Sequence, residues 1–325
     1  MKDFLRYEAQ LRLPGWDQNK LLSQSALIIG VGGLGTPAAL YLAAMGIGKL
    51  IIADPDVVAE ENLHRQPLYT PKSIGAYKAH CIKEYLLEFR PDLHVEAHTV
   101  WVNEGFLRDI GSSASIWIDG TDNIASRLVI DEMAFALHKP WVYGAIYQWE
   151  GQAALFYKTR YRDFFGAEVC GDSCSEGGVM GGIPGIVGSL QASLAAMYLA
   201  SPFSAPTNHL FRIDLLRGRM ESFRIGTQRV SNALEIGYNE AHELSEALWI
   251  DIREVCYPCI PRAQRKNWYD WDEWELPQKP IILICERGNR SRQIAFGLRK
   301  KTRREDIYSL EGGASLLFAA TKQGS

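Results

Sequence analysis

A glycine-rich turn between a strand and a helix constrains this chain more than any other feature. Residues 30–35 read Gly-Val-Gly-Gly-Leu-Gly, after the apolar run 26–29 and before the helical pattern of 38–44. Glycines let a ligand approach the backbone closely, and a helix N-terminus favours an anionic phosphate. The motif predicts a nucleotide-binding turn, although a turn without a ligand has the same spacing. Its glycines are Gly30, Gly32, Gly33 and Gly35.

Strands and helices continue to alternate after this turn. The apolar or periodic stretches predict a strand at 50–53, a helix at 78–89, and strands at 94–102 and 115–118. Such alternation predicts a Rossmann-like, mostly parallel sheet with both faces covered. The aromatic runs 141–147 and 152–157 resemble antiparallel strands that extend the sheet.

Two further segments complete this first part of the chain. The glycine-rich stretch 171–188 predicts a mobile crossing loop. The apolar run 183–200 is interrupted by polar residues and is too short and too polar to span a bilayer, so we expect a buried helix.

The chain is long enough for two domains. Its 325 residues exceed one usual core, because a domain takes roughly 150 residues. We place an α/β domain at 1–225, a polar linker at 226–238, and a smaller α/β domain at 239–325. In the smaller domain we expect strands at 247–250, 280–284 and 307–310, with a helix after Ser291.

The composition limits the location and the partners. The net charge of −3 gives no general attraction to nucleic acid or to an anionic membrane. Residues 1–10 are charged throughout and lack the apolar core of a secretory signal, so we expect a cytoplasmic protein. The six cysteines therefore indicate catalysis or metal binding more than a disulfide framework.

The residues around the turn separate two kinds of nucleotide chemistry. Asp54 ends the next strand, 24 residues after Gly30, and can bond a ribose hydroxyl of either NAD or ATP. Adenylyl transfer also needs cations on a triphosphate and a carboxylate for Mg²⁺, which hydride transfer does not. Taken singly, each charged residue is an ordinary surface residue. The candidates for adenylyl transfer are Asn62, Arg65, Gln66, Lys78 and Asp122.

Residues 1 to about 225 resemble the ubiquitin-activating-like adenylyltransferases of the ThiF/MoeB type, which activate sulfur-carrier proteins. The resemblance implies that Asp54 binds the ribose, that Arg65 and Lys78 bind the phosphates, and that Asp122 holds Mg²⁺. It also implies a homodimer and, as partner, a ubiquitin-fold carrier whose C-terminal Gly-Gly carboxylate is attacked. The matching motifs are Arg6-Tyr7 with Gln10, 30–35, 54–56, 62–66, Lys78, 121–123, 150–152 and 174–179.

Cys174 matches the family's crossover-loop cysteine, which takes the acyl group or joins a persulfide linkage. A flexible loop would let its thiolate approach an acyl-adenylate, whereas a buried small cysteine would be inert. Sequence does not separate these two possibilities.

The chain departs from the family at two places. Ala9 stands where the family has a second arginine, which removes a bidentate phosphate clamp that Arg6 or Arg12 would have to replace. Arg160 and Asp163 stand at the first pair of zinc cysteines, where an arginine cannot ligate zinc but the two residues could form an ion pair. We expect no zinc, although the spacing of four cysteines alone would allow a site. They are Cys170, Cys174, Cys256 and Cys259.

From about residue 238 the chain resembles a rhodanese domain, through 249–254, 260–261, 285–291 and 310–313. Cys285 lies between a strand and a helix, where loop N–H groups and the helix dipole favour a thiolate. Arg287 and Arg290 add positive charge. The four residues between Cys285 and Arg290 suit a single sulfur atom, whereas cysteine phosphatases have five. A rhodanese fold used only for docking remains an alternative.

Three smaller patterns occur in the same part of the chain. Cys256 and Cys259 would either resolve a persulfide as a disulfide or be incidental thiols. Trp268, Trp271 and Trp274 predict a helix face packed on the core. The basic run 299–304 predicts a solvated helix end, with a docking surface as the alternative.

These observations combine into one hypothesis with two alternatives. We expect an enzyme that uses ATP and Mg²⁺ to adenylylate a carrier, and that then transfers persulfide sulfur from Cys285 to form a thiocarboxylate. The sulfur donor would be a cysteine desulfurase or thiosulfate. We expect no membrane and no direct nucleic-acid partner. The alternatives are a non-catalytic scaffold and an NAD-linked oxidoreductase fused to a rhodanese domain.

Overall fold

The computed structural model describes residues 5–165, 178–201, 205–225, 234–253, 259–285, 289–314 and 317. The chain forms two compact units, Met1–Ile225 and Gly226–Ser325. Several predicted features lie outside the described residues. They are Cys170, Cys174, Cys256, Arg287 and residues 171–177 of the crossing loop. Residues 182–188, which were predicted to belong to that loop, are helical instead.

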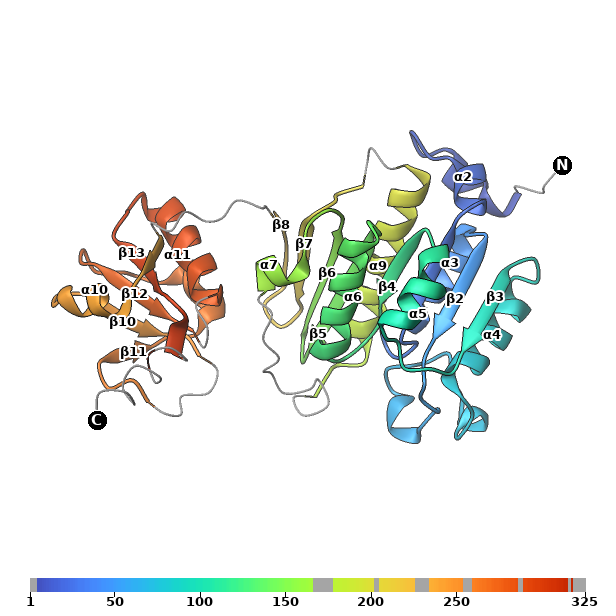
Figure 1. Ribbon diagram of the computed structural model, residues 1–325, viewed down its shortest axis with the longest axis horizontal. Helices are drawn as coiled ribbons and strands as arrows, with labels where there is room; N and C mark the ends of the chain where they lie inside the picture. The colour runs from blue at the N-terminus through green and yellow to red at the C-terminus, as the bar shows by residue number, and fades with distance from the viewer. Residues whose placement is uncertain are drawn as a thin grey trace. The chain divides into compact units, whose positions relative to one another are not determined.

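The first unit is built on an eight-stranded sheet of order β3-β2-β1-β4-β5-β6-β7-β8 (Figure 1). Strands β1 to β5 pair in parallel, and β6 to β8 continue the sheet antiparallel. The predicted fold class is therefore confirmed. The strands are β1 Ser25–Ile29, β2 Lys49–Ala53, β3 His94–His98, β4 Ile116–Asp119, β5 Trp141–Tyr147, β6 Glu150–Phe156, β7 His209–Asp214 and β8 Arg219–Arg224.

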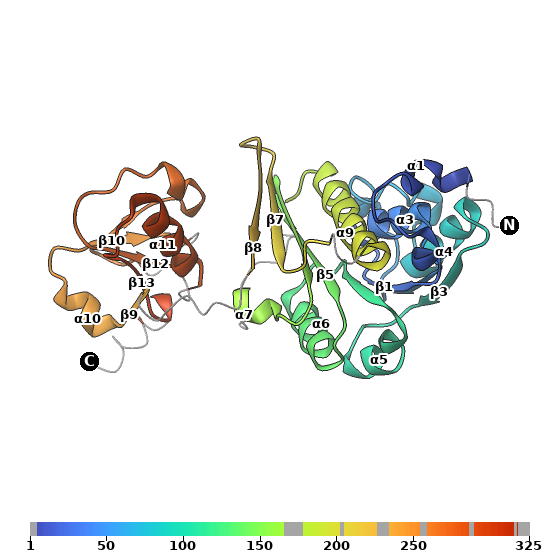
Figure 2. The ribbon, with the colours of Figure 1, turned by 90° about the horizontal axis from the view of Figure 1, so that it is seen from above.

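Helices cover both faces of this sheet (Figure 2). Helices α3 (Gly35–Met45), α4 (Lys78–Phe89) and α9 (Gly182–Ala200) cover one face, and α5 (Glu104–Asp109) and α6 (Ile124–Ala136) cover the other. The shorter helices are η1 Leu5–Tyr7, α1 Glu8–Leu11, α2 Gln18–Leu22, η2 Glu60–Asn62, η3 Pro71–Ser73, η4 Gly111–Ser113 and α7 Tyr161–Phe165.

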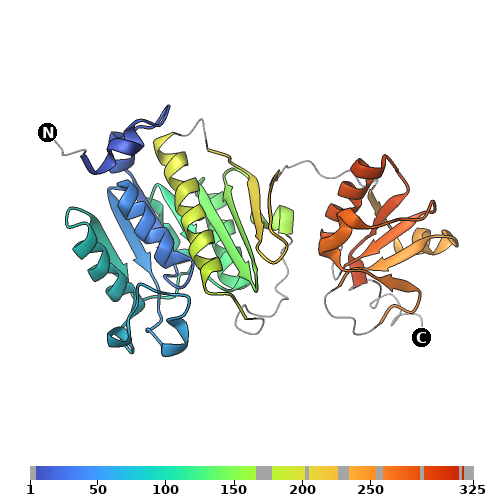
Figure 3. The same cartoon turned by 180° about the vertical axis from the view of Figure 1, so that it is seen from behind.

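Helix α9 confirms the buried helix expected at 183–200. The reason given for that prediction was wrong, because by length and composition this helix could cross a membrane. Its burial supports a core helix, since 61% of its most apolar 18-residue stretch is buried inside the fold. It lies beside α3 (Figure 3) and packs on β5 and β6. At Gly151 a Cβ atom would lie 2.3 Å from Val187, so this glycine lets the helix approach the sheet closely.

The second unit is built on a five-stranded parallel sheet of order β11-β10-β12-β13-β9. Its strands alternate with helices as expected for a small α/β unit. Apolar residues of α11 and the tryptophans around η6 pack on one face, and α10 packs on the other. The elements are β9 Glu235–Ile236, α10 Tyr238–Glu243, β10 Leu248–Asp251, β11 Ala263–Arg265, η6 Trp268–Glu273, β12 Ile281–Ile284, α11 Asn289–Thr302 and β13 Ile307–Leu310.

Two predictions for this unit need correction. The linker was predicted to run to residue 238, but Glu235 and Ile236 pair with β13, and Ile236 is buried. A strand of two residues is too short to show a periodic pattern. Trp268, Trp271 and Trp274 do pack on the core, but Trp268 and Trp271 belong to a 3-10 helix, whose three residues per turn match their spacing.

Candidate nucleotide site and sulfur loop

The candidate nucleotide site lies where the direction of strand connection reverses. Strands β1 and β4 are neighbours, and the helices that follow them, α3 and α6, cover opposite faces. Such a point leaves a crevice at the carboxyl ends of the strands, where ligands bind in open α/β sheets. The glycine turn follows β1, and the loop of residues 120–123 follows β4.

The glycine turn depends on close backbone packing. Gly30 has a φ of +82°, and a Cβ atom on Gly35 would lie 1.8 Å from the Gly30 carbonyl oxygen. A Cβ on Gly33 would lie 2.9 Å from Pro184 at the start of α9. Gly32 differs, because its Cβ would meet only the Gln66 amide nitrogen, at 3.5 Å. Three glycines therefore build the turn, and Gly32 leaves its surface open.

Asp54 is fixed beside this turn by backbone donors. The Val31 N–H donates to Oδ2 over 2.7 Å, and the Asp56 N–H donates to Oδ1 over 2.8 Å. Burial raises the pKa of Asp54, while these two bonds and the charge of Lys78 oppose the rise. Its carboxylate is thus held at the carboxyl end of β2, as the ribose assignment requires.

Lys78 is a buried cation at the same edge. It begins α4, and its Nζ atom lies 3.0 Å from Asp56 Oδ2. The side chain of Asp56 is 54% exposed, so this carboxylate can be solvated when the lysine engages another anion.

The Tyr69 hydroxyl donates to the Val31 carbonyl over 2.8 Å and ties the segment before α4 to the glycine turn. Burial raises the pKa of Tyr69. Sequence reasoning missed this residue, because only the fold brings it to the turn.

The segment 62–66 lies against the glycine turn and the start of α9. A Cβ on Gly181 would lie 2.4 Å from the His64 carbonyl oxygen. Arg65 is partly exposed and donates to the Glu61 carbonyl over 3.0 Å. Gln66 is 4% exposed, and its Oε1 has no hydrogen-bond partner within the described chain. A buried acceptor without a donor is costly, so this amide is suited to a ligand at Gly32.

Asn62 lies partly buried on the same segment, and its carbonyl accepts the backbone N–H groups of Arg65 and Gln66. No side-chain bond of Asn62 accompanies these backbone bonds among the described residues. The structure therefore brings the three predicted residues of this segment to one place.

Asp122 is exposed on the loop after β4. Beneath it, Asp119 accepts the N–H and hydroxyl of Thr121, and Arg127 Nε donates to Asp119 over 2.8 Å. Arg127 also bonds the Gly144 carbonyl over 3.1 Å, so the loop is anchored across two strands. Sequence reasoning missed this buried pair.

A carboxylate at this edge fits Mg²⁺, which prefers oxygen ligands and is usually shared with substrate phosphates. Among the described residues there is no group of three His, Cys, Asp or Glu side chains that could hold a metal without such help. Asp122 is therefore the candidate for the protein's share of the ligands.

The residues considered at the two departures from the family have partners of their own. Arg12 lies on the N-terminal segment and pairs with Glu8 over 2.6 Å. The Arg160–Asp163 ion pair was predicted wrongly: Arg160 pairs with Glu132 over 3.4 Å, and Asp163 is exposed. Helix α6 presents the carboxylates of Asp131 and Glu132 to this segment.

In the second unit Cys285 follows β12 and is 4% exposed. The Ser291 hydroxyl donates to its sulfur over 3.3 Å, and Ser291 and Ser309 hydroxyls lie 2.8 Å apart. Arg290 lies 4.4 Å above the Trp268 ring. Cys259 is exposed. The structure thus places two serines, which sequence reasoning did not single out, at the predicted sulfur loop.

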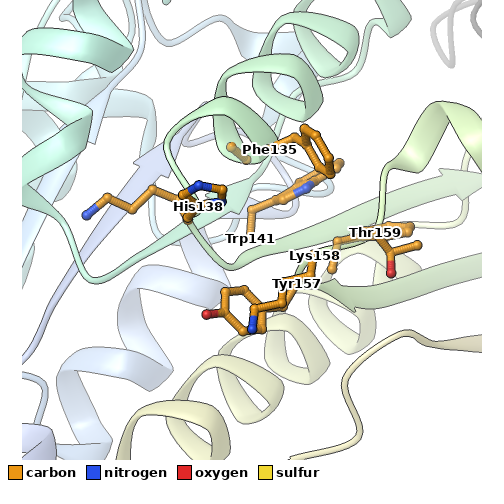
Figure 4. A pocket seen from close by; sticks show the side chains of 9 residues that line it. Phe135, His138, Trp141, Tyr157, Lys158 and Thr159 are labelled. Atoms are coloured by element: carbon orange, nitrogen blue, oxygen red, sulfur yellow. The ribbon is translucent and has the colours of Figure 1, made fainter.

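A small hollow lies at the opposite end of the strands of the large sheet from the glycine turn (Figure 4). Strand β5 begins there and β6 ends there, whereas the glycine turn is at the carboxyl ends of the parallel strands. The hollow is therefore separate from the nucleotide site. Its lining residues are Ala134, Phe135, His138, Lys139, Trp141, Phe156, Tyr157, Lys158 and Thr159.

Known proteins resemble this chain in sequence and in fold. A sequence model of the ThiF family matches residues 7–234. The chain belongs to the ThiF family. A probable molybdopterin-synthase adenylyltransferase of Porphyra purpurea is 40% identical over 190 residues, covering 55% of this chain and 50% of that protein.

A probable adenylyltransferase/sulfurtransferase MoeZ of Mycobacterium tuberculosis is 35% identical over 192 residues, covering 55% of this ThiF-family chain and 49% of that protein. The chain thus spans about half the length of these curated relatives. The crystal structure of E. coli MccB with ATP has a TM-score of 0.56 at 20% identity, covering 66% of each chain, and supports the fold alone.

Proposed function

We propose that the first unit uses ATP to adenylylate the C-terminal glycine carboxylate of a ubiquitin-fold sulfur-carrier protein. One observation supports this most: the glycine turn, Asp54, Lys78 and Asp122 gather at the carboxyl edge of β1, β2 and β4. The adenylyltransferase names of the two relatives agree with it. The expected homodimer and cytoplasmic location stay predictions.

Each group would have a separate task. The N–H groups of the turn and the start of α3 would hold phosphate oxygens, and Asp54 would accept a ribose hydroxyl. Lys78 would exchange Asp56 for a phosphate, which costs little because that carboxylate is half exposed. Mg²⁺, when bound at Asp122, would neutralise phosphate charge. The carrier carboxylate then attacks the α-phosphorus, and pyrophosphate leaves.

The second unit would supply sulfur as a rhodanese-like domain. The Cys285 thiolate attacks the outer sulfur of thiosulfate, a sulfur–sulfur bond forms, and sulfite leaves. The terminal persulfide sulfur then displaces AMP from the acyl-adenylate to give an acyl disulfide. A second thiol, that of Cys174 or of a cellular thiol, attacks the Cys285 sulfur and releases the thiocarboxylate. A cellular dithiol reduces the remaining disulfide. A cysteine desulfurase is the alternative donor.

Carrier-dependent exchange of labelled pyrophosphate into ATP tests the adenylylation step. We expect exchange with a carrier ending in Gly-Gly, and a loss of about 100-fold in Asp122→Asn, because a ligand of the charge-neutralising metal is weakened. No exchange with any such carrier would overturn the proposal and favour a scaffold. Thermal stabilisation by NAD but not by ATP would favour the oxidoreductase alternative.

Cyanide-dependent release of thiocyanate from thiosulfate tests the sulfur step separately. We expect Cys285→Ala to abolish it, because no thiolate remains to form the persulfide, while Cys259→Ala retains it. Unchanged release in Cys285→Ala would assign the activity to another cysteine.

A further inference from the structure

Two buried hydroxyls lie in series beside Cys285 in the core of the second unit: Ser291 bonds the sulfur, and Ser309 contacts Ser291. Ser291 lies in the first turn of α11, and Ser309 lies on β13, the strand next to β12. Neither serine is exposed, and Cys285 is 4% exposed. Aliphatic side chains of the same core surround them, including Ile294 and Leu283. Three polar groups therefore share one apolar setting.

The hydrogen bonds connect these groups in series. The Ser291 hydroxyl donates to the cysteine sulfur over 3.3 Å, and its oxygen can at the same time accept a hydrogen bond. Ser309 lies 2.8 Å away and can provide that hydrogen. A hydroxyl that receives a hydrogen bond becomes a stronger donor. The arrangement from Ser309 through Ser291 to Cys285 thus directs hydrogen-bond donation toward the sulfur.

We propose that Ser291 and Ser309 are positioning residues that stabilise the thiolate of Cys285 and the terminal sulfur of its persulfide. This inference rests on the proposed sulfur transfer. A hydrogen bond to an anionic acceptor is roughly twice as strong as one between neutral groups, so the pair contributes most when the sulfur is charged. Burial of two hydroxyls in an aliphatic core is otherwise costly.

The charged groups of the neighbouring elements have partners elsewhere. Arg290 on α11 lies over the Trp268 ring. At the end of β10, Arg253 and Asp251 form a bidentate pair, 2.7 Å at its shortest. Arg292 pairs with Glu235 of β9. The Ser291 hydroxyl donates directly to the sulfur, and the Ser309 hydroxyl contacts this donor.

The pH dependence of Cys285 alkylation tests the inference on the full chain. Iodoacetamide reacts with the thiolate, and mass spectrometry of the peptide that carries Cys285 separates it from the other cysteines. In Ser291→Ala we expect the midpoint pH of alkylation to rise by about one unit and the rate at pH 7 to fall about tenfold. In Ser309→Ala we expect a smaller shift in the same direction. Ser245→Ala, which changes an exposed serine, should match the unaltered chain.

The double variant separates chemistry from folding. Replacing both partners of a buried hydrogen bond by apolar groups is nearly neutral for stability, so Ser291→Ala with Ser309→Ala should fold. Because Ser309 acts through Ser291, the double variant should alkylate like Ser291→Ala alone. Ser291→Thr, which keeps the hydroxyl, should restore the original midpoint.

An unchanged midpoint in folded Ser291→Ala would overturn the inference, as would an additive effect of Ser309→Ala in the double variant. Thiocyanate release by the unaltered chain reports on sulfur transfer independently. A shifted midpoint without any release would therefore keep the role of the serines at Cys285 and reject the transfer step.

Discussion

The two candidate sites are built by different means. At the nucleotide site the backbone sets the geometry, because the chain passes so close to itself at Gly30 and Gly35 that no Cβ atom fits. At the sulfur site a few side-chain atoms set it, through two hydroxyls that lead to Cys285. A backbone-defined site should fail as a whole when one atom is added. A side-chain-defined site should change its chemistry while the fold persists.

The largest effect should come from one added methyl group in the glycine turn. In Gly35→Ala the new Cβ meets the Gly30 carbonyl oxygen, so we expect a loss of about 3 kcal/mol in the free energy of unfolding and no measurable ATP binding. Urea unfolding and calorimetric titration with ATP would measure both.

The matched control for the glycine turn is Gly185→Ala in α9. Nothing lies within 4 Å of its would-be Cβ, so alanine should raise stability by about 0.5–1 kcal/mol and leave ATP binding intact. Equal stability of the two variants would contradict the view that backbone contact defines the nucleotide site.

The next largest effect should lower the reaction rate and leave stability nearly unchanged. Lys78→Met should lower pyrophosphate exchange about 100-fold, because a cation on the phosphates is lost. Stability should change by less than about 1 kcal/mol, since the partner Asp56 is 54% exposed. Lys72→Met, which changes an exposed lysine, is the control. A stability loss as large as that of Gly35→Ala would show that Lys78 supports the fold more than the reaction.

The backbone-defined site was the more predictable of the two from sequence. Its glycines, Asp54, Lys78 and Asp122 form motifs at fixed spacings, and the alternation of strands and helices places them at one edge of the sheet. Sequence could not show Tyr69 or the Asp119–Arg127 pair, because their partners lie on other elements and have no fixed spacing.

The side-chain-defined site shows more clearly what could not be predicted from the sequence. Cys285 was evident between a strand and a helix, but Ser309, which contacts its donor Ser291, lies on a neighbouring strand 24 residues later. The error at Arg160 has the same origin, because Glu132 on α6 competes with the nearby Asp163 for its charge. Local spacing predicted the nearer partner, and tertiary packing selected the farther one.

The smallest expected effect is on the pH dependence of stability, which a carboxylate in each unit changes in opposite directions. Bonds from Arg304 at 2.8 and 2.9 Å lower the pKa of Asp306, so its stabilisation is present above about pH 4 and is lost as pH falls through the lowered pKa. Asp54 affects stability in the opposite direction, because burial raises its pKa. As pH falls through the raised pKa, protonation removes the cost of burying the charged carboxylate, and the free energy of unfolding rises.

Arg304→Ala should therefore cost less than about 1 kcal/mol at neutral pH, since Asp306 is 41% exposed, and should flatten the acid limb of stability below about pH 4. Urea unfolding across that range, with separate probes for the two units, measures this. The first unit should keep its acid dependence, because Asp54 is untouched. A change that appears in the first unit instead would mean that charge, and not backbone packing, sets the difference between the two.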